Sequence, residues 1–315
     1  MSIFKAEFTD YDHYQEFTQN WDVDFRVLSK TNFYVYLNMY LSDTIQLSKT
    51  SLNGKIDQYG LSPKGFRSIV IPNLKNGSFN WLGKNVTNNQ LLIFPKNRNL
   101  DAVSFDGFEI FILDIKEEYL FLLLEKLALN KALLVFEGNQ HIFHLDQRFA
   151  LTFLQNAEKF LQRAMIQQSK GIENNQLHLF LLDNLVTPLL KYINIDYSTN
   201  SKPKKRKRDK ALSDAIEIIN FQTELTPSIS ELCSLTNVSE RTLEYAFLER
   251  FQVSPSEYIK ATKLHKIRNE LTVAKEQNLD ISTVANKYGF WHSGQFALDF
   301  KTQFGVLPSS IFNKY

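Results

Sequence analysis

Two similar stretches near the C-terminal end of the chain carry side chains that can hydrogen-bond the edges of nucleic-acid bases. In VSERTLEYAFLERFQVSPSEYI, from Val238 to Ile259, the outward positions include Arg241 and Glu244. In YGFWHSGQFALDFKTQFGVLPSSIF, from Tyr288 to Phe312, they include Gln295. Arginine can form a two-pronged hydrogen bond with guanine, glutamine can do so with adenine, and glutamate can accept from cytosine. These residues are therefore candidates for sequence-specific contacts with DNA.

The two stretches are copies of one unit. Their inward positions align at an offset of 53 residues (296 − 243 = 53), as Leu243, Phe247 and Phe251 against Phe296, Phe300 and Phe304. Apolar residues spaced by four lie on one side of a helix. With the short apolar segment before each turn, every copy predicts a helix-turn-helix. We expect Ser239 to cap the second helix of the first copy and Gly289 to make the turn in the second.

The segment between the copies predicts a rigid spacer. SEYIKATKLHKIRNELTVA is one amphipathic pattern of about 19 residues, which as a helix spans about 28 Å. Recognition helices held that far apart can enter successive major grooves of B-DNA, whose turn is about 34 Å. The alternative is a duplicated helical hairpin that serves only packing, and the rigid spacing favours DNA recognition over it.

The C-terminal third of the sequence is similar to a known family. The segment from about Ala211 to Phe312 resembles the DNA-binding domain of the AraC/XylS family of bacterial transcription regulators, through VSERTLEYAFLERFQVSPSEYI and DISTVANKYGFWHSGQFALDFKTQFGVLPSSIF. The resemblance implies two helix-turn-helix units joined by a long helix, double-stranded DNA as a partner, and activation by contact with RNA polymerase. The preceding half is similar, more weakly, to the sensor half of the family branch that includes regulators of ethanolamine use.

The resemblance also assigns roles to individual residues. Leu298 could pack on a thymine methyl group or only on protein, Gly294 has no side chain for a base contact, and Arg241 with Glu244 could instead form a solvated surface pair. The base-contacting positions of the family fall on Arg241, Glu244, Tyr245, Ser293, Gly294, Gln295 and Leu298. Our candidates for phosphate contact are Ser239, Thr242, Arg250, Lys260, Lys263, His292, Lys301, Lys204, Lys205, Arg206, Lys207 and Arg208.

Positive charge is concentrated in one short segment. Although the net charge is +2, KPKKRKRDK, from Lys202 to Lys210, carries seven Lys or Arg and one Asp. From Ala211 to Tyr315 there are ten Lys or Arg against twelve Asp or Glu. We expect the basic segment to neutralise DNA phosphates. A plain soluble linker and a nuclear import signal are the alternatives.

The 315 residues favour two domains, because a single core seldom grows that large. Residues from about 20 to 115 alternate as strands between Gly, Asn and Pro turns, which predicts a β-barrel or sandwich. After Ile115 the period becomes helical, and Leu151, Leu154, Ala157, Leu161 and Ala164 form a stripe that could pack in the core or against a second copy. We expect an α+β chain with a sensor and dimerisation domain at 1–195, a basic linker at 196–210 and an all-α DNA-binding domain at 211–315.

Several other classes of protein are disfavoured. Cys233 is the only cysteine, so no internal disulfide or cysteine-rich zinc site can form, and we expect it to pack in the core. No run of about 18 apolar residues and no secretory signal occurs, which predicts a cytoplasmic protein without membrane contact. His292 lacks a second His or Cys at ligand spacing, so we assign it to phosphate contact or turn packing and Trp291 to the core under the turn.

No catalytic motif stands out, and no histidine lies between residues 20 and 115, where a metal-binding barrel would need one. We therefore expect no enzyme activity, cofactor or metal. The alternative function is a ligand-binding or protein-interaction module in the N-terminal barrel, with DNA binding secondary. Trp21 and Trp81 could line a ligand site there or belong to an ordinary core. A small-molecule effector and a second copy of the chain are further candidate partners.

Overall fold

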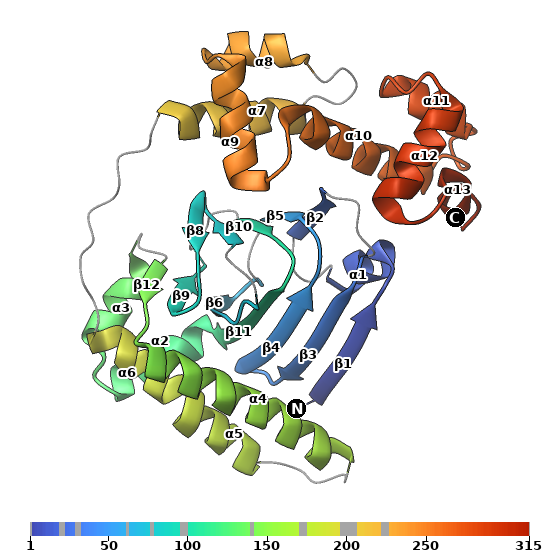
Figure 1. Cartoon of the computed structure of the whole chain (residues 1–315). Coiled ribbons are helices and arrows are strands. Elements are labelled where there is room, and N and C mark those ends of the chain that lie inside the picture. The colour runs from blue at the N-terminus through green and yellow to red at the C-terminus, as the bar shows by residue number, and fades with distance from the viewer. Residues whose placement is uncertain are drawn as a thin grey trace.

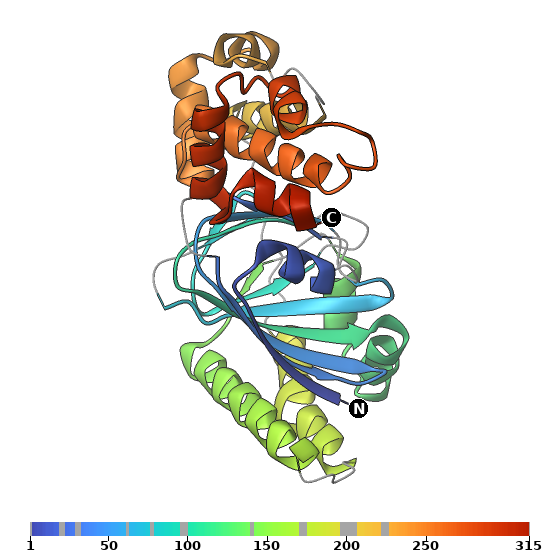
Figure 2. The ribbon, with the colours of Figure 1, turned by 90° about the vertical axis from the view of Figure 1, so that its right-hand side faces the viewer.

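The structure, a computed structural model, describes residues 2–18, 23–28, 33–60, 63–75, 79–94, 100–138, 142–169, 175–195, 207–221 and 227–314. An N-terminal domain of strands and helices lies against a C-terminal domain of helices (Figures 1 and 2). The predicted α+β class is confirmed. The strands form two sheets rather than a closed barrel.

Both sheets are antiparallel throughout the described residues. The larger sheet has the order β1-β3-β4-β11-β6-β9-β12, with β1 (Ser2–Phe8), β3 (Val35–Leu41), β4 (Ile45–Leu52), β6 (Phe66–Pro72), β9 (Gln90–Ile93), β11 (Phe108–Lys116) and β12 (Ile142–His144). The smaller sheet has the order β2-β5-β10-β7-β8, with β2 (Val23–Val27), β5 (Ile56–Gly60), β7 (Phe79–Trp81), β8 (Lys84–Val86) and β10 (Leu100–Ser104).

The larger sheet is covered on both faces, because successive side chains of a strand point to opposite sides. From β11, Ile110 and Ile112 face the core between the two sheets, where Trp81 is also buried. Phe111 and Leu113 face the helices. These are α2 (Glu117–Lys126), α3 (Asn130–Glu137), α4 (Gln147–Ser169), α5 (Asn175–Leu181), the short π-helix η2 (Leu182–Val186) and α6 (Thr187–Ile195). Trp21 lies outside the described residues.

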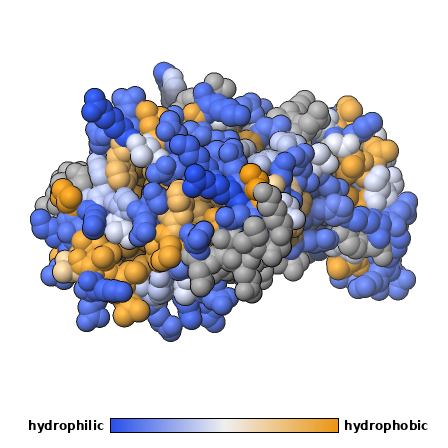
Figure 3. Space-filling view, turned by 90° about the horizontal axis from the view of Figure 1, so that it is seen from below, coloured by the Kyte–Doolittle hydropathy of each residue, from blue (hydrophilic) through white to orange (hydrophobic). Residues whose placement is uncertain are grey.

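The predicted stripe along α4 is partly wrong. Ala157, Leu161 and Ala164 are buried, but Leu151 is 51% exposed. The aromatic side chains of Phe153 and Phe160 fill the core face, so the buried side of α4 is rotated away from Leu151. Hydrophobic residues gather on part of the surface seen from below the helices (Figure 3), and the exposed ones of α2 to α5 are Leu122, Leu134, Leu151, Ile166 and Leu179.

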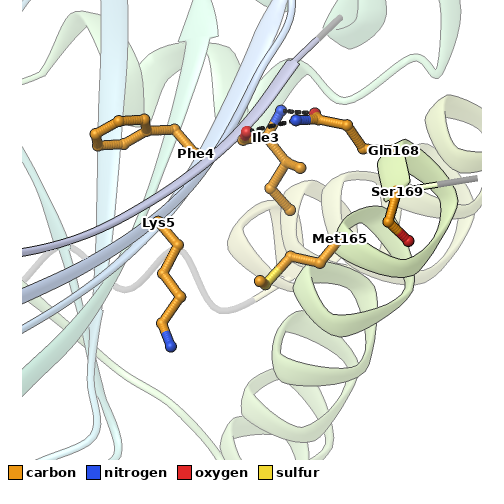
Figure 4. Close-up of a pocket in the computed structure, with 6 residues that line it drawn as sticks. All are labelled: Ile3, Phe4, Lys5, Met165, Gln168 and Ser169. Atoms are coloured by element: carbon orange, nitrogen blue, oxygen red, sulfur yellow. Dashed lines mark hydrogen bonds between the residues drawn. The ribbon is translucent and has the colours of Figure 1, made fainter. Parts of the chain in front are cut away.

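The edge strand β1 is capped by a side chain of α4. The Gln168 amide accepts from the Ile3 backbone N–H at 2.6 Å and donates to the Ile3 carbonyl at 3.1 Å. Figure 4 shows this pair at the rim of a shallow pocket lined also by Met165 and Ser169. At this one residue of the edge, the amide bonds the backbone groups that a neighbouring strand would otherwise bond. A short helix, α1 (Tyr11–Phe17), follows β1.

The C-terminal domain is built around one long helix. Its helices are α7 (Lys207–Phe221), α8 (Ile229–Thr236), α9 (Glu240–Phe251), α10 (Pro255–Leu271), α11 (Ile281–Lys287), α12 (Ser293–Phe304) and α13 (Pro308–Lys314). Tyr258 and Ala261 of α10 belong to one core with α7, α8 and α9. Leu264 and Ile267 belong to a second core with α11, α12 and α13. The unbroken 17 residues of α10 therefore join two separate helical units.

Local sequence signals start these helices. Ser228 and Ser254 form capping boxes at α8 and α10, which satisfy backbone N–H groups of the first turn. The Ser239 hydroxyl accepts from the Thr242 N–H, so the predicted cap of α9 is confirmed. Gly289 has a φ of +85° in the turn before α12, where a side chain would be strained. Helix α7 begins at Lys207, inside the range expected as linker.

None of the described helices is long and apolar enough to span a bilayer. Cys233 is partly buried against the core of the first unit, as expected from its sequence position. No group of three or more metal-ligating side chains occurs among the described residues.

Candidate nucleic-acid interface

The second helix of each unit, α9 and α12, presents the predicted base-contacting residues to solvent. On the inward side, Leu243, Phe247 and Phe251 are buried in the first unit, as are Phe296 and Phe300 in the second. The outward side chains of both helices are exposed, namely Arg241, Glu244, Tyr245, Ser293, Gln295 and Leu298. Helical periodicity alone therefore accounts for their exposure.

In α9, Arg241 is held by the residue one helical turn later. Its guanidinium carbon lies 5.5 Å from the centre of the Tyr245 ring, and its NH2 nitrogen is 3.5 Å from the Tyr245 hydroxyl. Cation–π attraction of this kind restricts the long arginine side chain. The planar guanidinium group therefore lies beside the Tyr245 ring on the exposed side of α9.

In α12, a chain of polar contacts ends at Gln295. The Gln295 amide nitrogen donates to Asp299 Oδ1 at 3.0 Å. The other carboxylate oxygen, Oδ2, lies 2.7 Å from Lys260 Nζ of α10. Sequence reasoning places Lys260 at a phosphate and does not single out Asp299, because the pairing joins different helices.

The other predicted phosphate residues differ in their exposure and in their partners. Lys207, His292 and Lys301 are exposed, and His292 occupies the N-cap position of α12 without a side-chain cap bond. Arg208 pairs with Glu249, and Arg250 pairs with Asp101 of the N-terminal domain. Ser239 and Thr242 share a hydrogen bond of 2.9 Å at the start of α9, and Lys263 is half-buried on α10. Lys204, Lys205 and Arg206 lie outside the described residues.

The assignment of Trp291 to the core under the turn is wrong. Its side chain is 72% exposed. The neighbouring Phe290 packs there instead, with its ring centre 5.5 Å from that of Phe296. The sequence offers two adjacent aromatic residues after Gly289, and either could fill the core under the turn. The backbone after Gly289 directs Phe290 inward.

The N-terminal domain contacts the middle of the C-terminal domain through buried polar groups. Tyr258 donates to Asp57 Oδ2 at 2.7 Å, and Arg26 donates to the Tyr258 hydroxyl at 2.9 Å. Burial raises the pKa of Asp57, and the nearby Arg26 opposes that rise. Burial also raises the pKa of Tyr258 well above its ordinary value. These groups tie β2 and β5 to α10.

His265 of α10 contributes a second buried contact. Its Nε2 accepts from the Val27 backbone N–H at 3.0 Å. Burial, together with the positive charges of Arg26 and Arg268, holds the pKa of His265 well below its ordinary value. The imidazole is therefore neutral at neutral pH, as an acceptor of this bond must be.

Helices α9 and α12 are each hydrogen-bonded to the N-terminal domain near their C-terminal ends. Arg250, near the end of α9, pairs with Asp101, and Lys55 donates to the Gln252 carbonyl at 2.7 Å. Gln303, near the end of α12, donates to the Val27 carbonyl. Arg241 lies nine residues before Arg250, which is about 14 Å along a helix. The ends that carry the candidate base contacts thus lie away from the N-terminal domain.

Comparisons with known proteins agree with this geometry. Residues 232–314 match a family of helix-turn-helix domains. The XylDLEGF operon transcriptional activator 3 of Pseudomonas putida is 29% identical over 99 residues, which cover 31% of this chain and 30% of that protein. A probable thc operon regulatory protein of Rhodococcus erythropolis is 26% identical over 95 residues, 30% of this chain and 29% of that protein. The chain therefore spans less than a third of these relatives.

Among solved structures, the AraC-like transcriptional activator CuxR covers 85% of this chain and 96% of its own, with 11% identity and a TM-score of 0.43. The family likeness rests on the C-terminal residues. The C-terminal residues 232–314 thus form an AraC-type helix-turn-helix domain, and the proteins similar to it are transcription regulators of the AraC/XylS family.

Proposed function

We propose that the chain is a sequence-specific regulator that inserts α9 and α12 into successive major grooves of double-stranded DNA. The observation that supports this most is the joint placement of the two helices. Each has an exposed N-terminal half with polar side chains, each contacts the N-terminal domain near its other end, and one unbroken helix joins them. The 17 residues of α10 give a spacer of about 25 Å.

The base contacts follow from side-chain chemistry. Arg241 offers two parallel N–H donors to guanine, and Gln295 offers one donor and one acceptor to adenine. Glu244 accepts from cytosine, and Leu298 packs on a thymine methyl group. Ser293 and Tyr245 have hydroxyl groups that can bond either bases or phosphates.

The decisive experiment selects bound fragments from genomic DNA with the full chain and then measures variants on the selected site. Arg241→Ala should weaken binding by about 1–3 kcal/mol at that site and change binding to random DNA little. Arg148→Ala, an exposed arginine on α4, is the matched control and should behave like the parent. Equal losses on selected and random DNA would show that Arg241 does not contact bases.

Phosphate neutralisation comes from the basic segment and from exposed cations of the recognition unit. We propose that Lys204, Lys205, Arg206, Lys207 and Arg208 supply sequence-independent affinity. Replacing all five with Gln should weaken binding to every sequence and reduce the slope of log affinity against log salt by about 0.9 for each phosphate that is no longer neutralised. An unchanged slope would assign the segment to a linker.

We propose that the outcome of binding is activation through contact with RNA polymerase. The Pseudomonas putida relative is named as a transcriptional activator, and its similarity to this chain supports the assignment. Transcription in vitro from a promoter that carries the selected site should rise when the chain is added. A fall in transcription would instead identify a repressor.

We propose that the exposed hydrophobic face of α4 pairs two copies of the chain. Leu151 and Ile166 lie fifteen residues apart (166 − 151 = 15) and are both more than half exposed, and fifteen residues bring helical side chains back to within about 60°. Light scattering of the full chain should give a dimer mass, and Leu151→Lys with Ile166→Lys should give a monomer. Leu134→Lys on α3 is the control. A parent that is already monomeric would contradict this pairing.

A further inference from the structure

The contacts around Gln295 assign a role to Asp299, a residue that belongs to none of the expected base or phosphate positions. We infer that Asp299, anchored by Lys260, is a positioning residue that fixes the Gln295 amide in the orientation that selects adenine. This inference rests on the proposed function and deepens it. It concerns one side chain of α12 and one base pair of the site.

The orientation of a free glutamine amide is not determined by its shape, because its oxygen and nitrogen ends are nearly the same size. An ionised carboxylate can only accept hydrogen bonds. Contact with Asp299 Oδ1 at 3.0 Å therefore requires the Gln295 nitrogen, and not its oxygen, to face Asp299. Consequently the amide flip that would exchange donor and acceptor loses a charge-assisted hydrogen bond.

The fixed amide still has the groups that adenine requires. A glutamine that binds adenine uses its oxygen to accept from N6 and one of its two N–H groups to donate to N7. The second N–H is not needed by the base, and Asp299 accepts it. Guanine presents two acceptors in the major groove, and an amide with one N–H already bonded has a single donor left to offer. The arrangement thus favours adenine and disfavours guanine.

Lys260 makes an acidic partner tolerable at a DNA-binding surface. Its Nζ lies 2.7 Å from Asp299 Oδ2, and the Asp299 side chain is 15% exposed. The lysine offsets the carboxylate charge, which would otherwise repel phosphates. Each carboxylate oxygen therefore has its own partner, so rotation of the group breaks at least one contact. Because Lys260 belongs to α10, the helix that joins the two units also sets the position of this amide.

The test uses the full chain and a pool of random duplex DNA, from which bound sequences are selected and counted. The parent should enrich a site with one adenine that is preferred by about tenfold, and Gln295→Ala should abolish the preference at that position. Asp299→Asn should reduce the same preference to about threefold or less, because an asparagine side chain can accept or donate and restores both amide orientations. Preferences at all other positions should stay as in the parent. Adding Asp299→Asn to Gln295→Ala should change nothing more.

Asp214→Asn, on α7, is the matched control and should leave every preference unchanged. If Asp299→Asn fails to fold in a thermal unfolding scan, Asp299→Ala replaces it, since alanine favours helices, and the same local loss is expected. An Asp299 variant whose preference at the Gln295-dependent position equals that of the parent would overturn the inference. An equal loss of preference at every position would also overturn it, because it indicates a merely structural role. Lack of any position that depends on Gln295 would overturn it too. A parent that enriches no sequence at all would refute the proposed function itself.

Discussion

The ion pair between Arg250 and Asp101 distinguishes a contact between domains from a contact with DNA. The sequence predicts Arg250 at a phosphate, but its side chain is 11% exposed and that of Asp101 is 30% exposed. A hydrogen bond between charged groups that are largely removed from water contributes about 1.5–3 kcal/mol. We expect Arg250 to stabilise the contact between domains and to make no phosphate contact.

The perturbation is a double-mutant cycle with Arg250→Met and Asp101→Asn, two substitutions that keep side-chain size while removing charge. Arg250→Met should lower the free energy of unfolding by about 2–4 kcal/mol, because it leaves the carboxylate without its partner and also removes the cation–π contact with Phe251. The coupling energy of the pair should be about 1–3 kcal/mol. Urea unfolding of the four proteins at one pH measures it.

DNA binding of the same proteins at several salt concentrations provides the second readout. Arg250→Met should leave the salt slope unchanged, whereas Lys301→Met, which removes an exposed lysine of α12, should reduce it by about 1. A coupling energy near zero together with a reduced slope for Arg250→Met would refute the reasoning. In that case the arginine would leave Asp101 to meet a phosphate.

Three further predictions concern pH and the turn. As pH falls below about 6.5, the unfolded chain binds a proton that folded His265 resists, so the free energy of unfolding should fall by up to about 1.4 kcal/mol per pH unit; His265→Gln should remove this slope in urea unfolding. Burial raises the pKa of Asp114 to about 7 from 3.8. The folded chain therefore keeps this carboxyl protonated while the unfolded chain loses its proton, so the free energy of unfolding should fall as pH rises from about 4 towards 7, by about 4 kcal/mol at most. Asp114→Asn should flatten that fall. Gly289→Ala should lower the free energy of unfolding by roughly 1–2 kcal/mol, because a residue with a Cβ is strained at positive φ and Gly289 has a φ of +85°. A clash is not the cause, since the added Cβ would lie 3.8 Å from the nearest atom, Lys263 Nζ. Gly294→Ala, which meets nothing within 4 Å, should change stability little.

The C-terminal fold was predictable because its signals are local and occur twice. A helix buried on one side must repeat its apolar residues every three or four positions, and a helix start needs a capping side chain. Both requirements can be recognised within a few residues of the sequence, as in the cap Ser239 and in the buried residues Leu243, Phe247 and Phe251. The exposure of Arg241 and Gln295 then follows from the phase of the helix.

The contacts that orient these side chains were not predictable, because they join distant parts of the chain. Asp101 and Arg250 are separated by 149 positions, and no periodicity relates them. Asp299 meets Gln295 one turn away, but its link to Lys260 depends on how α12 crosses α10. On α4, leucine and phenylalanine at nearby positions give two equally apolar arcs, and only packing decides that Phe153 is buried and Leu151 is not.

Hydrogen bonds from β2 and β10 couple the arrangement of these strands to the spacing of α9 and α12. Val27 of β2 accepts a hydrogen bond from α12 and donates one to α10, while Asp101 in β10 holds the end of α9. A displacement of β2 relative to β10 must therefore change the angle between α9 and α12 or break these bonds. Under the proposed insertion into successive grooves, which requires one spacing and angle, whatever stabilises the present arrangement of the strands should also alter DNA affinity. By thermodynamic reciprocity, DNA binding must alter the stability of that arrangement to the same extent.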